Sequence, residues 1–144
     1  MYTEFLSKLP RTATYENLPQ EKIDKIKKEF YSAFDVEIPE DYIELLHFTN
    51  GLSYDGHSIC GVYDEDFLVE HPRKKSMDIL RFNSSFREMT DISDYILLGK
   101  SSLDLIVYDI GEKKYKILSN GVMECFGTFD TFPELLYAFF DAEK

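Results

Sequence analysis

The chain has 144 residues, of which 44% are hydrophobic and 15% aromatic, and its formal net charge is −11. This length supports one hydrophobic core but is short for two ordinary domains, so we predict a single domain over residues 1–144. A strongly acidic chain is a poor ligand for nucleic acid, which proteins bind through clustered lysine and arginine. No apolar stretch approaches the ~18 residues of a membrane span, and Glu4 stands where a signal peptide requires positive charge. We therefore expect a cytoplasmic protein that does not bind membranes.

The acidic residues are concentrated in two segments. Residues 29–70 contain eleven Asp or Glu, and no Lys or Arg lies between Lys28 and Arg73. Residues 117–143 add five acids and no base. If the fold brings the two segments together, they form one negative surface that attracts a basic partner. The alternative is an acidic face that is only solvated.

The apolar spacing predicts a first helix over residues 19–34. Its apolar residues recur every three to five positions, with lysine and glutamate between them. They are Leu18, Ile23, Ile26, Phe30 and Phe34.

A second helix, within IPEDYIELLHFTNG at residues 38–51, has clear start and stop signals. Pro39 fits a first helical turn, and Glu40 and Asp41 complement the positive end of the helix dipole. Its apolar face consists of Tyr42, Leu45, Leu46 and Thr49. Asn50 and Gly51 tolerate the left-handed conformation that ends a helix, so we place its end at Thr49.

The segments that follow have weaker patterns. Asp55 and Gly56 predict a turn before a short strand in HSICGVY, whereas DEDFLVEHPRKKS is interpreted as a loop. MDILRFNSSFREM predicts a helix, although Asn83, Ser84 and Ser85 lower its helix propensity. Its apolar face consists of Ile79, Phe82, Phe86 and Met89.

The last third of the chain has the residue pattern that is typical of an antiparallel meander followed by a helix. YILLG, LDLIVYDI, KYKILS and VMECFG are rich in β-branched or aromatic residues, and Asn120-Gly121 is a hairpin signal. TFDTFPELLYAFF predicts a final helix, with Thr131 and Glu134 as a capping box. We therefore predict an α+β fold, with a twisted antiparallel sheet of about five strands and helices packed on it.

The stretch IPEDYIELLHFTNG resembles the signature of the SUKH superfamily, in which a Leu-Pro-x-Asp-Tyr helix ends in Asn-Gly. YILLGKSSLDLIVYDI is similar to the two-strand segment of that family, and FDTFPELL is similar to its terminal helix, so the resemblance covers about residues 18–141. The chain departs from the family pattern in having Ile38 for leucine, and Lys100, Ser101 and Ser102 where many members are rich in glycine.

The resemblance implies an α+β fold and a binding role. Bacterial members of the family resemble immunity proteins that bind and block toxins, often nucleases, and fungal members regulate cell-wall glucan synthesis. The positions that match the family are Pro39, Asp41, Tyr42, Asn50, Gly51, Gly99 and Asp104. We interpret most of them as structural, because a proline start, a glycine stop and a tyrosine on the apolar face are accounted for by the helix itself. Asp104 either caps a turn or faces the partner.

No pattern in the sequence indicates a catalytic, cofactor or metal site. His57 and Cys60 have metal-ligand spacing, but a second ligand pair is missing. The sequence contains neither a glycine-rich phosphate loop nor a GxSxG motif. We therefore predict that the protein is not an enzyme and needs no cofactor or metal. Cys60 and Cys125 are expected to be buried free thiols.

Two tyrosines outside the core periodicity are candidate interface anchors. Tyr54 and Tyr63 flank turns in the acidic segment, and aromatic residues are enriched in interfaces. The acids beside them that we expect to face a basic partner are Asp55, Asp64, Glu65 and Asp66.

Our first hypothesis is a non-catalytic binding module, an immunity protein that occludes a basic toxin domain of the nuclease type. The alternative is a regulatory interaction protein in cell-wall or glucan synthesis. A second alternative is a small-ligand-binding protein or enzyme that uses a cleft beside residues 99–104. Unpaired sheet edges could also join two copies into a homodimer.

Overall fold

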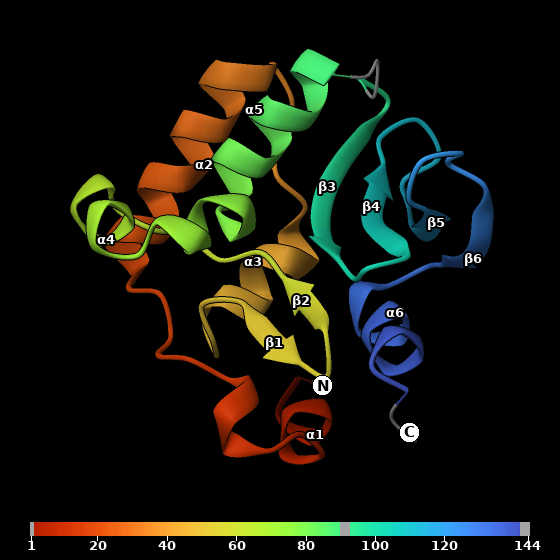
Figure 1. Ribbon diagram of the computed structural model, residues 1–144, viewed down its shortest axis with the longest axis horizontal. Coiled ribbons are helices and arrows are strands. Elements are labelled where there is room, and N and C mark those ends of the chain that lie inside the picture. Colours follow the sequence, from red (N-terminus) through yellow and green to blue (C-terminus); the bar gives the residue numbers. More distant parts are fainter. Residues whose placement is uncertain (1, 90–92, 142–144) are drawn as a thin grey trace.

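The structure is a computed structural model that describes residues 2–89 and 93–141 (Figure 1). In these residues six strands form one antiparallel sheet in the order β1-β2-β3-β4-β5-β6, so each strand pairs with the next along the chain. The strands are β1 (Leu52–Tyr54), β2 (His57–Ile59), β3 (Tyr95–Lys100), β4 (Asp104–Asp109), β5 (Lys114–Ser119) and β6 (Cys125–Phe129). The predicted α+β class and antiparallel sheet are confirmed. β1 is one strand more than expected, because its three residues are too short for their pattern to be recognised.

The helices pack around this sheet. They are α1 (Tyr2–Ser7), η1 (Arg11–Ala13), α2 (Gln20–Phe34), α3 (Glu40–Leu46), α4 (Glu65–Glu70), η2 (Pro72–Met77), α5 (Ile79–Met89) and α6 (Phe132–Phe139). Figure 1 shows α2 beside α5, with α4 on the outer side of α2 and α6 below the β4–β6 end of the sheet. The Arg87 guanidinium of α5 lies 4.8 Å from the Phe34 ring centroid of α2, which joins these two helices.

The hydrophobic core lies between the sheet and the helices. The predicted apolar faces supply much of it, including Ile23, Ile26, Phe30, Tyr42, Leu45, Leu46, Phe132, Leu135 and Leu136, all buried. Burying one large apolar side chain stabilises a fold by about 1.5–3 kcal/mol. With its tyrosine and both leucines fully buried, α3 is a central element of this core.

The second helix is shorter than predicted. Pro39 is its N-cap, with φ −61° and ψ 136°, rather than part of the first turn, and α3 ends at Leu46 instead of Thr49. Thr49 is nevertheless fully buried, and its hydroxyl has partners there: it donates to Gly51 O (2.7 Å) and accepts from the Tyr15 N–H (2.9 Å). Gly51 has the expected positive φ of +87°. Asn50 does not, and its side chain has the different role described below.

The prediction of a loop over DEDFLVEHPRKKS is wrong. This segment contains α4 and the 3-10 helix η2. Leu68 is the buried residue of α4, and η2 buries none, so neither has the repeated apolar positions by which an amphipathic helix is recognised.

Three other local predictions are confirmed with changes in detail. The α5 helix forms, but Met89 at its end is 80% exposed while Asn83 is fully buried. Asn120 and Gly121 lie in the β5–β6 connection, which spans residues 120–124 rather than two residues. At the start of α6 the Thr131 hydroxyl accepts a hydrogen bond from the Glu134 N–H (3.3 Å), as a cap should.

Both cysteines are free thiols, but only Cys60 is buried as expected, because Cys125 is exposed on β6. Burial raises the pKa of the Cys60 thiol well above its usual range, and the thiolate is the reactive form.

We expect a disulfide reagent such as DTNB to titrate one thiol in the native protein and two in denaturant. Cys125→Ser is the matched variant, and it should leave no fast-reacting thiol. Two fast thiols in the native wild type would contradict this placement of Cys60.

Candidate partner-binding surface

The candidate site is built on the chain that leaves β2, residues 62–64, which two side chains hold in place. The Asn50 amide forms two hydrogen bonds to the backbone of Val62, donating to its carbonyl (2.8 Å) and accepting from its N–H (2.7 Å). The Tyr63 N–H donates to Asp78 Oδ1 (2.9 Å), and Asp78 is only 2% exposed. The backbone that carries the Tyr63 ring is therefore rigidly positioned.

An aromatic cluster extends from Tyr63 along α4. The Tyr63 and Phe67 rings are stacked, with centroids 5.1 Å apart and an interplanar angle of 14°. The next ring is His71, 4.4 Å from Phe67. Spaced four residues apart, the three rings lie along one side of α4 and its ends. Phe67 is 38% exposed, so the cluster reaches the surface.

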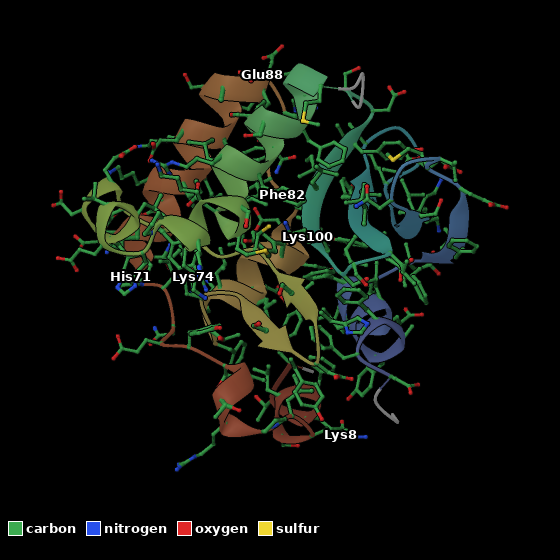
Figure 2. All side chains as sticks on the ribbon, viewed as in Figure 1. Lys8, His71, Lys74, Phe82, Glu88 and Lys100 are labelled. Carbon is green, nitrogen blue, oxygen red and sulfur yellow. The ribbon has the colours of Figure 1, made fainter. Side chains whose placement is uncertain are left out.

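Tyr15 and Lys74 complete the cluster from distant parts of the chain. Lys74 Nζ lies 4.7 Å from the Tyr15 ring centroid and 6.0 Å from that of Tyr63, within cation–π range. Figure 2 shows Lys74 in η2 near His71, at the end of the structure where α4 lies. Tyr15 is 39% exposed, so aromatic faces from two segments are accessible at one place.

Two hollows flank residues 62–64. One, of about 430 Å³, is lined by residues that include Tyr15, Glu16, Tyr63, Phe67 and Lys74. The other, of about 450 Å³, lies toward α2 and α5 and is lined by residues that include Lys25, Glu29, Asp66, Asp78 and Arg81. Both are also lined by Lys22, Val62, Tyr63 and Asp64, so the surface has a ridge with a depression on each side.

Charges around this ridge are more balanced than the sequence suggests. Lys22 pairs with Asp64 (Nζ–Oδ2 2.8 Å), and this hydrogen bond holds the pKa of Asp64 below its usual range. Arg81 pairs with Glu65 and with the buried Asp78. Both bases lie outside the acid-rich segment and are brought to it by α2 and α5. Among the described residues Asp66 forms no ion pair and is exposed, so it remains available to a partner.

The structure places the predicted partner-binding residues in three separate locations. Tyr63, Asp64, Glu65 and Asp66 lie together on the ridge and the start of α4. Tyr54 and Asp55 lie at the β1–β2 turn, where the ring of the following His57 packs 4.8 Å from Phe139 of α6. Asp104 begins β4, where its N–H donates to Ser101 Oγ (3.1 Å), a turn contact made by its backbone.

The two acidic segments meet, but away from α4. The carboxylate of Asp41 accepts from the N–H of Phe132 (3.2 Å), so it caps the start of α6. Glu37, Glu40 and Asp130 line a hollow of about 440 Å³ there. Lys27 pairs with Glu40, and Lys114 pairs with Asp130. The acids at this junction are thus partly neutralised, and they form a surface distinct from the ridge.

The other residues on which the sequence resemblance rests have structural roles. The Tyr42 hydroxyl donates to Cys60 O (2.5 Å), which fixes α3 to the end of β2. Gly99 lies against Ser58 O of β2, where any side chain would collide. Asn50, predicted as part of a helix stop, instead binds Val62. The hollows beside the ridge have other linings, so the proposed cleft at residues 99–104 gains no support from them.

Sequence reasoning missed Tyr15, Phe67, His71, Lys74 and Asp78. The spacing of Tyr63, Phe67 and His71 is helical and could have indicated an aromatic face, had the segment not been interpreted as a loop. Tyr15 and Lys74 gave no local signal, because their contact joins segments 59 residues apart.

Within residues 2–89 and 93–141, no group of three or more His, Cys, Asp or Glu is arranged to hold a metal ion. None of the helices in these residues has the length and apolar character needed to cross a bilayer. The sequence matches no protein-family model and no curated protein.

Proposed function

We propose that the protein is a non-catalytic binding module that occludes a basic protein partner, most simply a toxin domain of the nuclease type. The observation on which this depends is the aromatic cluster of Tyr15, Tyr63 and Phe67, in which Tyr15 and Phe67 are exposed and Tyr63 is half-buried, on a backbone held by buried polar side chains. Aromatic residues in such positions dominate the binding energy of many interfaces. The resemblance of residues 38–51 to the SUKH signature supports an immunity role within this class.

In the proposed mechanism the aromatic rings and the acidic residues have different roles. Tyr63 and Phe67 would lose water and fill a depression on the partner, which slows dissociation. Exposed acids at the rim, Asp66 and Glu70 on α4, would speed the encounter with a basic surface, and salt would weaken that effect. Blocking a substrate groove in this way requires stoichiometric binding and no chemical step.

The test uses the product of the neighbouring gene, in particular a secreted protein with a C-terminal nuclease-like domain, immobilised for surface kinetics. Phe67→Ala should weaken binding by about 10–30-fold, mainly through faster dissociation. Asp66→Lys with Glu70→Lys should slow association about tenfold at low salt and less at high salt.

Tyr54→Ala is the matched control for Phe67→Ala. Tyr54 is 41% exposed, similar to Phe67, but lies at the β1–β2 turn, so its loss should leave the kinetics unchanged. Circular dichroism checks that each variant folds. If Tyr54→Ala weakens binding and Phe67→Ala does not, the surface is misplaced. A neighbouring operon for wall synthesis, with no binding to a toxin domain, would favour the regulatory alternative.

A further inference from the structure

We propose that the hollow between Tyr15 and Tyr63 is a binding site for a lysine or arginine side chain of the partner, and that Lys74 occupies it in the free protein. The inference deepens the proposed function and rests on it only for the source of the ligand. The cation site itself is a property of this chain.

The contacts of Lys74 are those of a bound cation. Its Nζ lies over the Tyr15 ring, at the edge of cation–π range from the Tyr63 ring, and donates to the Tyr15 hydroxyl (3.4 Å). Among the described residues it forms no ion pair with a carboxylate. The Lys74 ammonium is therefore stabilised by ring faces and one hydroxyl and not by carboxylates. Another cation could use the same groups.

Buried side chains hold the backbone at both tyrosines, whereas Lys74 reaches the site only through its own side chain. The Tyr15 N–H donates to the fully buried Thr49 hydroxyl (2.9 Å), and the Tyr63 N–H donates to the buried Asp78 (2.9 Å). Stacking on Phe67 further fixes the orientation of the Tyr63 ring. Lys74 instead reaches the site on a flexible four-carbon chain, so it can leave while the backbone of the cage stays in place.

The charges at the site favour a cation over an anion once Lys74 leaves. Lys22 and Asp64 both line the hollow and neutralise each other through their ion pair. Glu16 also lines it, and among the described residues its carboxylate forms no ion pair. The vacated site would therefore contain two π faces, a hydroxyl and a net negative charge. A planar guanidinium is suited to such faces because it stacks on aromatic rings.

The test needs no partner. Nα-acetyl-arginine amide is titrated into wild type and Lys74→Met, with the tyrosine ring resonances followed by NMR, and Nα-acetyl-citrulline amide serves as a neutral ligand of the same shape. Lys74→Met should bind the arginine derivative at least about tenfold more tightly than wild type does, because the resident cation is gone. The citrulline derivative should show no such gain.

Two further variants separate the cage from general charge effects. Lys75→Met removes the same charge from the adjacent, exposed lysine and should produce no gain. Tyr15→Leu in the Lys74→Met background should abolish it. If Lys74→Met shows no gain, or binds arginine and citrulline equally well, the cation site is overturned, while the partner-binding test above remains independent. A gain with no toxin binding would keep the site and reject the toxin.

Discussion

Gly51→Ala is expected to lower the free energy of unfolding by about 3 kcal/mol, whereas Gly56→Ala should lower it by about 1 kcal/mol. Both glycines have positive φ, +87° and +77°, so both variants strain the backbone. Only at Gly51 would the new Cβ also meet backbone atoms, 2.9 Å from Ile59 O and 3.1 Å from Gly61 N. At Gly56 nothing lies within 4 Å.

Urea unfolding monitored by circular dichroism measures both variants under the same conditions. Because the backbone strain is shared, the difference between them reports the close approach of the chain to β2. Equal midpoints would mean that β2 can move away from Gly51 at little cost. The chain after α3 would then pack only loosely against this strand.

Gly99 explains why that close approach is difficult to relieve. A Cβ at Gly99 would lie 2.8 Å from Ile59 Cδ1 and against Ser58 O, on the β3 side of β2. The short strand β2 is therefore confined by Gly51 on one side and by Gly99 on the other. Gly51 and Gly99 thus have one shared physical role, which is to let β2 pack closely between its neighbours.

The elements that the sequence predicted correctly are those with a repeated pattern. α2 and α6 have apolar residues at helical spacing, and β3 to β6 are rich in β-branched and aromatic residues. α4 and β1 are too short for such a pattern, and a single buried residue such as Leu68 provides no period. Elements with several core residues could therefore be predicted from their period, whereas the three-residue strand β2 was predicted only because the Asp55-Gly56 turn precedes it.

The site was predicted less well than the fold, because its contacts join distant segments. Tyr63 was identifiable as an aromatic residue at a turn in an acidic segment. The partners that make it a surface, Tyr15 and Lys74, could not be identified by any spacing rule. The number of acids in residues 29–70 also does not indicate that Lys22 and Arg81, which lie outside this segment, pair with Asp64 and Glu65. Local charge runs therefore overstate the charge of a folded surface.

Asn83 is the clearest case in which local propensity misleads. In the sequence it lowers the helix propensity of residues 77–89, yet in the structure it is fully buried on α5. β2 pairs with β3 at Lys100 and Gly99, and Cys60 N–H reaches Leu98 O, but no strand of the described residues reaches Leu97 from that side. The Asn83 amide binds there instead, donating to Leu97 O (2.9 Å) and accepting from Leu97 N–H (2.8 Å). One side chain thus replaces a missing strand partner.

Asn83→Ala is therefore expected to destabilise the protein by about 3 kcal/mol, because it leaves the buried N–H and carbonyl of Leu97 without partners. Ser85→Ala, an exposed position on the same helix, is the matched control and should be neutral or slightly stabilising, since alanine is the better helix former. Urea unfolding gives both values, with similar m-values expected if the fold is kept.

Hydrogen exchange adds a local measurement of the same contact. The Leu97 amide should be protected in wild type and in Ser85→Ala. In Asn83→Ala it should exchange faster, relative to the other β3 amides. If the Leu97 amide stays protected in Asn83→Ala, another group satisfies that edge of β3, and the substitute-strand role of Asn83 is wrong.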